Sequence, residues 1–125
     1  MFTRKTAVVG ITVLVCGGRA FRDVVWLRSA LDRLHVEVPF ARVIAGGACG
    51  ADTLAAEWAV SRGIPADVFM ADWEGLGRKA GPIRNQRMLD EGKPDLVVAF
   101  PGGRGTADMV RRARDAGIEV TFIEA

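Results

Sequence analysis

Residues 96–106 read LVVAFPGGRGT, and this stretch decides the fold class. An uninterrupted apolar run rich in valine is typical of a strand that is buried on both faces of a parallel sheet. A glycine-rich turn follows, and then an amphipathic stretch from Thr106 to Ala116 that ends at Gly117, where a helix is expected to stop. A strand, a glycine turn and a helix in this order are one building unit of an α/β protein.

The same order recurs along the whole chain. Short apolar runs occupy 11–16, 42–45, 66–70, 96–100 and 119–123, and helix patterns follow Asp23 and cover 53–61, 82–91 and 106–116. Asp23 is expected to cap the first helix, and Pro82 is expected to be the first residue of the third. Gly63 and Gly92 are expected to mark helix ends. This alternation predicts a Rossmann-like, doubly wound parallel sheet of about five strands and four helices. We expect the strand order 3-2-1-4-5.

Length and composition limit the classes of protein that need consideration. The 125 residues predict a single domain over 1–125, with residues 1–6 as a frayed start. A net charge of +2 is small for a nucleic-acid-binding face, so nucleic acid is not an expected partner. The longest apolar run, 7–16, is about half of a membrane span, which predicts a soluble, cytoplasmic protein without membrane contact. The connection 71–81 is the one long irregular segment, and such loops tend to be functional or mobile.

Three glycine clusters each follow a predicted strand and precede a predicted helix. They contain Gly17 and Gly18; Gly46, Gly47 and Gly50; and Gly102, Gly103 and Gly105. In a parallel sheet these junctions lie at one edge, and the amides of glycine turns and helix N-termini bind phosphate there. Thr106 either caps its helix or donates its hydroxyl to the same phosphate. One such cluster is often only a tight turn, but three at one edge favour a phosphate-bearing ligand.

Other chemistries lack their motifs in this chain. Neither a Gly-x-Gly-x-x-Gly fingerprint nor a Gly-x4-Gly-Lys-Ser/Thr loop occurs, which disfavours hydride transfer and ATP hydrolysis. The single histidine, His35, and the two cysteines, Cys16 and Cys49, form neither a zinc motif nor a disulfide framework. No Cys–His pair is evident, which disfavours thiol catalysis. We therefore expect no metal and no cofactor.

Residues 101–106, PGGRGT, resemble the PGGxGT signature of the SLOG superfamily, which includes the Lonely-guy phosphoribohydrolases. The motifs at 16–19, 46–52, 71–73 and 80–86 are similar to those of its small single-domain, YspA-like and YpsA-related branch. The resemblance covers 13–120. It implies a Rossmann-like fold and a sensor or binding domain that holds a nucleotide-derived ligand, of the ADP-ribose or nucleoside-phosphate type, in a glycine-lined crevice.

The same resemblance leaves two alternatives open. The Lonely-guy signature continues as PGGxGTxxE, and its glutamate takes part in cleaving the glycosidic bond; here that position is Met109. An N-glycoside hydrolase acting on nucleoside monophosphates would need another carboxylate, and Asp108 and Asp52 are the candidates. Single-stranded DNA binding is the second alternative, since 46–52 is similar to the Ala-Arg-Gly-Ile-Asp segment of the DNA-processing protein A family. Cys49 stands in place of that segment's arginine.

Several side chains complete the predicted ligand site. Arg19 could hold a phosphate in bidentate fashion. Arg84 and Asn85 are expected in the first turn of the third helix, where a cation is unfavourable unless an anion lies nearby. Asp52 either stabilises its helix N-terminus or binds a ribose hydroxyl. Trp73 either stacks on a base or pins its loop to the protein.

The remaining polar and aromatic candidates are expected to have ordinary structural roles. Gln86, Arg87, Arg111, Arg112 and Arg114 are expected to be solvated surface residues. Trp26 and Trp58 are expected either to pack in the core or to support a homo-oligomer.

Overall fold

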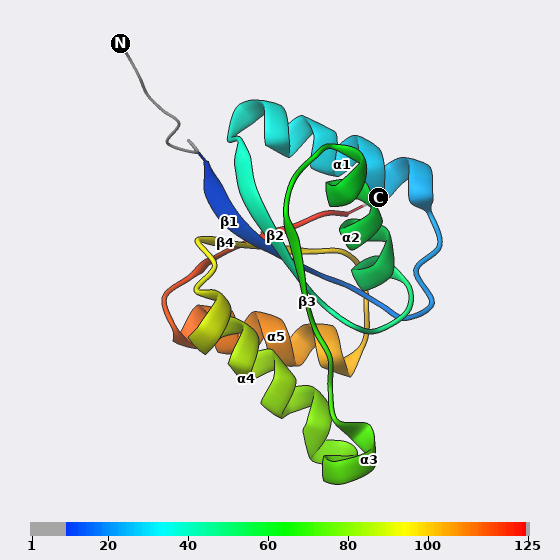
Figure 1. The fold of residues 1–125 in the computed structure, drawn as a ribbon, viewed down its shortest axis with the longest axis vertical. Coiled ribbons are helices and arrows are strands. Elements are labelled where there is room, and N and C mark those ends of the chain that lie inside the picture. The colour runs from blue at the N-terminus through cyan, green and yellow to red at the C-terminus, as the bar shows by residue number, and fades with distance from the viewer. Residues whose placement is uncertain (1–9, 125) are drawn as a thin grey trace.

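The computed structural model describes residues 10–124, so the expected frayed start at 1–6 lies outside the described residues. Its core is a five-stranded parallel sheet in the order β3-β2-β1-β4-β5, which confirms the predicted order (Figure 1). The strands are β1 (Ile11–Cys16), β2 (Phe40–Gly46), β3 (Ala66–Phe69), β4 (Leu96–Ala99) and β5 (Glu119–Phe122).

Two helices cover each face of the sheet. The helical elements are α1 (Val24–Glu37), α2 (Ala51–Ser61), α3 (Trp73–Leu76), a 3-10 turn η1 (Gly77–Lys79), α4 (Ala80–Gly92) and α5 (Arg104–Asp115). Because side chains alternate along a strand, Val13 and Val15 of β1 pack under α1 and α2, whereas Leu14 packs under α4 and α5 (Figure 1). The strands are therefore buried on both sides, as their uninterrupted apolar sequence predicts.

The tryptophan at position 58 belongs to the core. Trp58 is fully buried, and its indole N–H donates a hydrogen bond of 2.8 Å to Asp32. Trp26 packs against the rings of Phe21 and Phe100. Trp58 is therefore not available for an intermolecular contact. Of the two roles predicted for it, core packing and support of a homo-oligomer, the structure shows core packing.

Two helices begin earlier than the sequence pattern indicates. α2 begins at Ala51 rather than Thr53, and α4 begins at Ala80 rather than Pro82. Pro82 is the third helical residue, where its missing N–H is still one of those without an intrahelical acceptor. Arg84 is thus the fifth residue of α4, one turn in from the end. The prediction that it lies in the first turn is wrong. The position of Arg84 in the helix therefore does not by itself indicate a nearby anion.

Two further expectations are corrected at loop positions. Gly103 is the N-cap of α5 and Thr106 is its third residue, so Thr106 is not the cap. The segment 71–81 is not irregular, because α3 and η1 occupy most of it. Asp72 caps α3 by accepting a hydrogen bond of 2.9 Å from the amide of Gly75. Within the part of the chain that the structure describes, no helix combines the length and the apolar character that a membrane crossing requires.

Candidate functional site

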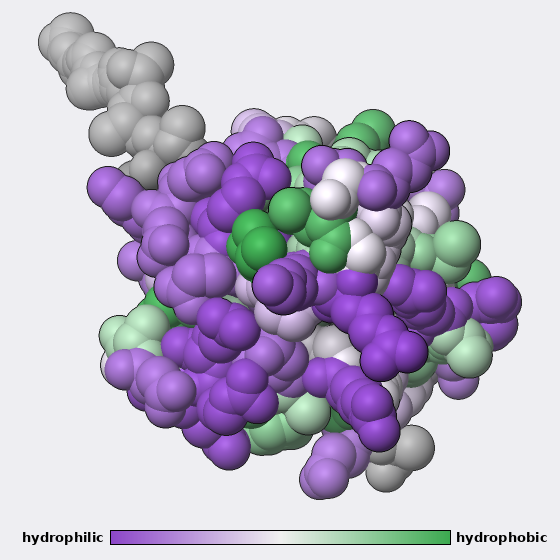
Figure 2. All heavy atoms as spheres, turned by 90° about the horizontal axis from the view of Figure 1, so that it is seen from below, coloured by the Kyte–Doolittle hydropathy of each residue, from purple (hydrophilic) through white to green (hydrophobic). Residues whose placement is uncertain are grey.

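A cavity of about 850 Å³ opens at the carboxyl edge of the sheet, between the loops that follow β1, β2 and β4 and the start of α4. Most of the predicted ligand residues line it: Gly17, Gly18, Arg19, Asp52, Trp73, Arg84, Asn85, Gly103, Gly105, Thr106 and Asp108. Figure 2 shows the molecule from below the view of Figure 1, which is the side toward which α3 projects. Hydrophilic side chains predominate on this face. The tertiary structure therefore brings these residues, which lie far apart in the sequence, around one space.

Four predicted glycines do not line this cavity. The side chains of Arg84 and Asp52 lie over Gly46, and Met70 covers Gly47. Gly50 and Gly102 pack against the backbone of the loop after β1. These glycines let other groups approach closely, and the direct ligand role predicted for them remains a prediction.

The three glycine loops hold one another in place. The amide of Gly18 donates to the carbonyl of Pro101 at 2.9 Å, and the amide of Ala51 donates to the carbonyl of Gly18 at 3.2 Å. Gly50 has a φ of 78°, and a Cβ at this position would collide with the carbonyl oxygen of Gly18. Only glycine fits this conformation and this contact. The loop after β1 is thus clamped between the loops after β2 and β4.

The N-terminus of α5 faces the cavity. Gly103, which has no side chain to cap the helix, precedes it, and the first intrahelical amide bond runs from Ala107 to the carbonyl of Gly103. The amides of Arg104, Gly105 and Thr106 therefore have no intrahelical acceptor. Together with the partial positive charge of the helix end, they form a favourable position for an anion.

Arginine dominates the charge of the cavity. Five guanidinium groups line it, against the two carboxylates of Asp52 and Asp108; the arginines are Arg19, Arg78, Arg84, Arg104 and Arg111. The sequence predicts Arg111 to be solvated, and Arg78 and Arg104 are not among the predicted ligand residues. In the sequence, Arg104 lies within the third glycine loop, Arg111 follows that loop by about two helical turns, and Arg78 lies in the connection 71–81. The cavity thus concentrates positive charge in a molecule whose net charge is only +2.

Arg84 reaches across the end of β2. Its Nη1 donates to the carbonyl of Phe69 at 3.3 Å, and its Nε donates to the Oδ1 of Asn85 at 3.1 Å. Burial lowers the pKa of the guanidinium, and the nearby Asp52 offsets part of that effect. The charge is therefore incompletely neutralised and available to an anion.

Asp52 is one of the two buried polar residues of the described chain, with 7% of its surface exposed. Its Oδ2 accepts a hydrogen bond of 3.3 Å from the amide of Ala48. Burial raises the pKa of Asp52 to about 7, although Arg84, the Ala48 amide and Arg19 act in the opposite direction. At neutral pH this carboxyl group can therefore exist in both protonation states.

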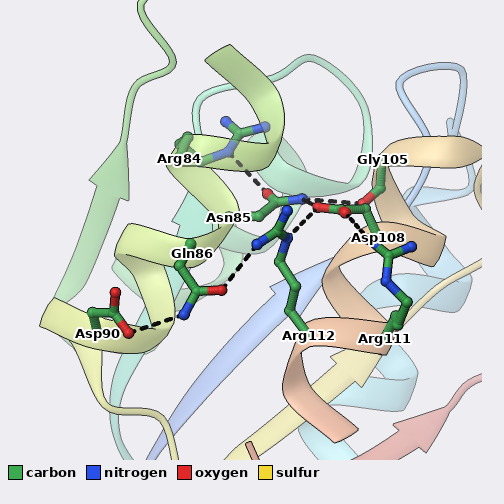
Figure 3. Close-up of polar contacts among 8 residues, drawn as sticks. All are labelled: Arg84, Asn85, Gln86, Asp90, Gly105, Asp108, Arg111 and Arg112. Atoms are coloured by element: carbon green, nitrogen blue, oxygen red, sulfur yellow. Dashed lines mark hydrogen bonds and ion pairs between the residues drawn. The ribbon is translucent and has the colours of Figure 1, made fainter. Parts of the chain in front are cut away.

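Asp108 is engaged by its neighbours, as Figure 3 shows. Asn85 donates to its Oδ2 at 3.0 Å, Arg112 donates to the same oxygen at 2.8 Å, and Arg111 donates to Oδ1. Burial alone would raise the pKa of Asp108, but the hydrogen bonds from Arg112 and Asn85 and the charges of Arg112 and Arg111 outweigh it and hold that pKa below its usual range. An ionised carboxylate with both oxygens occupied is a poor proton donor.

The network also corrects the expectation for three surface residues. Arg112 is not simply solvated, since its Nη1 donates to Gln86 at 3.0 Å in addition to its bond with Asp108. Arg111 pairs with Asp108, and Gln86 donates onward to Asp90 (Figure 3). The reason is tertiary: α4 and α5 lie side by side and place these side chains against one another.

Asn85 connects the two helices. It is 4% exposed, and its Nδ2 donates to the carbonyl of Gly105 at 3.3 Å as well as to Asp108. Its Oδ1 accepts from Arg84. Asn85 therefore fixes the start of α5 relative to Arg84.

Trp73 forms part of the rim. The guanidinium carbon of Arg19 lies 5.3 Å from the centre of its ring, and 47% of the residue is exposed. A Cβ on Gly81 would lie 3.2 Å from the ring edge, so the absence of a side chain there lets Trp73 pack against α4. The ring pins α3 to α4 and still presents surface to the cavity.

The cysteines do not form a nucleophilic site. Cys16 is buried at the end of β1, and burial raises its pKa to about 12, with the charge of Asp52 adding to the effect. Its thiol therefore stays protonated at neutral pH. Cys49 is exposed in the loop after β2, and each of the two is a free thiol.

Comparison with known proteins identifies the family. The model of the YspA, cpYpsA-related SLOG family matches residues 11–75, which hold the first two glycine loops and Trp73. The chain belongs to this SLOG family. The gene 61 protein of Mycobacterium phage D29 is 40% identical to this SLOG protein over 116 residues, which cover 86% of this chain and 92% of the phage protein.

A solved structure supports the fold of the SLOG protein. DNA processing protein A (DprA) from Streptococcus pneumoniae superposes with a TM-score of 0.74 over 93% of this chain, at 19% sequence identity. The SLOG chain covers 51% of that protein, about half its length. At this identity the similarity shows a shared architecture.

Proposed function

We propose that this protein binds a nucleotide-derived small molecule, of the ADP-ribose or nucleoside-phosphate type, as a sensor or binding domain. The observation that carries the proposal is the convergence of five arginines and the uncapped N-terminus of α5 on one cavity of about 850 Å³. Cavities of several hundred cubic ångströms suit ligands of this size. A cation-rich cavity that also exposes free amides favours phosphate over a neutral ligand.

The arrangement of the walls supports one orientation of the ligand. The phosphate would lie on the amides of Arg104, Gly105 and Thr106, with the side chains of Arg104 and Arg111 beside it. The base would lie toward the rim, where Trp73 and Arg19 offer a flat apolar and cationic surface. Arg84 would contact the ligand between these two ends.

Two features favour binding over cleavage. Met109, at the position of the Lonely-guy glutamate, is 1% exposed and belongs to the core under α5. Asp108 already accepts three hydrogen bonds. N-glycoside hydrolysis remains the second candidate on one observation: Asp52 is a buried carboxyl group on the cavity wall whose pKa of about 7 suits proton transfer.

The first test is a titration with AMP, ADP-ribose and a short single-stranded oligonucleotide, followed by calorimetry, with each mixture then analysed for free base. We expect saturable binding of a nucleotide without release of base. Release of base with time would establish the hydrolase instead. Binding of the oligonucleotide alone, with a steep dependence on salt, would replace both by single-stranded DNA binding.

The site assignment is tested by Arg84→Ala. Removal of a partly buried cation that faces the cavity should weaken nucleotide affinity by about 2–3 kcal/mol, or roughly 30- to 150-fold. Arg87→Ala is the matched control, because Arg87 lies on the same helix, pairs with Glu91 and lies over the ring of Phe69. Equal affinity of the two variants would move the ligand away from Arg84.

A further inference from the structure

Asp52 has a buried carboxylate oxygen for which the described residues supply no hydrogen-bond donor. Oδ2 accepts from the amide of Ala48, whereas Oδ1 accepts no hydrogen bond from residues 10–124. The residue is 7% exposed and lines the cavity wall. A buried acceptor without a donor is unfavourable, because it has lost its hydrogen bonds to water without replacement. The geometry therefore favours a ligand that brings a donor to this point.

Arg84 does not supply that donor. A Cβ built on Gly46 would lie 2.5 Å from the Nη1 of Arg84 and 2.8 Å from the Oδ2 of Asp52, so the two side chains face each other over Gly46. They nevertheless form no ion pair or hydrogen bond, and Arg84 donates instead to Phe69 and Asn85. The carboxylate oxygen that faces Arg84 over Gly46 is Oδ2, and Oδ1 accepts no hydrogen bond from residues 10–124.

The charge of Asp52 also determines what cannot bind there. A phosphate against a buried carboxyl group would face like charge in a poorly hydrated place. The phosphate is favoured on the opposite wall, at the N-terminus of α5 beside Arg104 and Arg111. The aromatic surface of Trp73 lies at the rim. In a nucleotide, the group between the phosphate and the base is the sugar, and its hydroxyls are hydrogen-bond donors.

We propose that Asp52 selects ribonucleotides over deoxyribonucleotides by accepting a hydrogen bond from a ribose hydroxyl. The inference rests on the proposed function and makes it more specific, since it defines the sugar of the ligand. Rejection of the deoxy analogue follows from the same geometry: a bound ligand without the hydroxyl covers the buried oxygen of Asp52 and supplies no donor to it. Single-stranded DNA, which lacks the 2′-hydroxyl, would be disfavoured for the same reason.

The experiment measures the affinities of AMP, GMP, 2′-deoxy-AMP and 3′-deoxy-AMP for the wild-type protein and for Asp52→Asn. We expect the wild-type protein to bind AMP at least about tenfold more tightly than 2′-deoxy-AMP, and 3′-deoxy-AMP serves as the control for loss of the other ribose hydroxyl. Asp52→Asn should bind AMP and 2′-deoxy-AMP within about threefold of each other, because an amide NH₂ can occupy the position of Oδ1. The AMP preference of the wild-type protein should also increase from pH 6 to pH 8, because an ionised carboxylate is the stronger acceptor.

The possible results separate this inference from the proposed function. Equal affinity of the wild-type protein for AMP and 2′-deoxy-AMP, with affinity lost in Arg84→Ala, would overturn the role of Asp52 and leave nucleotide binding intact. An unchanged preference in Asp52→Asn would also overturn it. A preference for GMP over AMP that Asp52→Asn abolishes, without discrimination between sugars, would assign Asp52 to the base edge and overturn the ribose contact. Failure of every nucleotide to bind would overturn both.

Discussion

At the residue scale, the two carboxylates of the cavity differ because their neighbours differ. Asp108 lies between Asn85, Arg111 and Arg112, which hold it ionised. Asp52 has one amide donor and a buried position, so that its pKa is raised. The sequence offered both as candidate acids. The structure favours Asp52 as the residue that meets a ligand and Asp108 as one that holds α4 to α5.

We expect Asp108→Asn to lower the free energy of unfolding by about 1–3 kcal/mol at pH 7, since charge-assisted hydrogen bonds are lost in a side chain that is only 14% exposed. The pKa of Asp108 is lowered in the folded state. Its stabilising contribution is therefore present above the unfolded pKa of about 3.9 and is lost as the pH falls through the folded value. Denaturant unfolding at pH 7 and pH 3 measures this. A difference between wild type and variant that is the same at both pH values would contradict the assignment.

At the element scale, the glycine loops perform two separable tasks. Gly102 lies against the loop after β1, where a Cβ would come within 2.7 Å of the amide nitrogen of Gly18 and would collide with Thr106. At Gly103, one residue later, a Cβ would have nothing within 4 Å, and the residue lines the cavity. The first glycine allows two loops to pack, and the second leaves room for a ligand.

We expect Gly102→Ala to lower the free energy of unfolding by about 1–3 kcal/mol, because the added methyl group has no space. Gly103→Ala should change stability by less than about 1 kcal/mol and weaken AMP binding about tenfold or more, because the methyl group occupies the approach to the helix amides. Thermal unfolding and calorimetry of both variants provide the comparison. Gly105→Ala, also in open space but within the helix, serves as a control for fold. Unaltered nucleotide affinity in Gly103→Ala would argue against phosphate at this helix end.

At the scale of the whole molecule, stability and ligand recognition depend on the same buried acid. The unfolded chain releases the proton of Asp52 near pH 3.9, whereas the folded protein holds it to a pKa of about 7. Between these values the folded state binds more protons than the unfolded state, so this residue makes the free energy of unfolding fall as the pH rises. Above pH 7 both states are ionised and the contribution is constant.

We expect Asp52→Asn to be nearly as stable as the wild-type protein at pH 4 and more stable by about 2–4 kcal/mol at pH 8, since the amide has no charge to bury. Denaturant unfolding of both proteins from pH 4 to pH 8 measures this difference. Groups that titrate equally in both proteins cancel in the comparison. A variant that is less stable than wild type at pH 8 would show that the carboxylate is compensated in the folded state.

The sequence by itself determined the architecture of this protein. Apolar runs such as 96–100, each followed by a glycine turn and an amphipathic stretch, have one low-energy arrangement, which is a parallel sheet with helices on both faces. The same local pattern placed the glycine loops at one sheet edge, and the motifs in these loops pointed to the family. The sequence pattern located the helix starts less accurately, as at Pro82. The first amides of a helix have no intrahelical acceptor, and the apolar periodicity does not mark the residue at which the helix begins.

Only the tertiary structure decided how the side chains at that edge divide their roles. Asp108 and Arg112 lie on one helix, yet Asn85 and Gln86, which complete their network, come from another. Asp52 at the start of α2 is buried and lies near Arg84 of α4 over Gly46, although Asp52 and Arg84 are far apart in the sequence. Hydrogen-bond partners, exposure and pKa values belong to groups brought together across the fold, and they cannot be obtained from local spacing. Charge and spacing in the sequence identified which residues could act, and packing determined which of them are left free to do so.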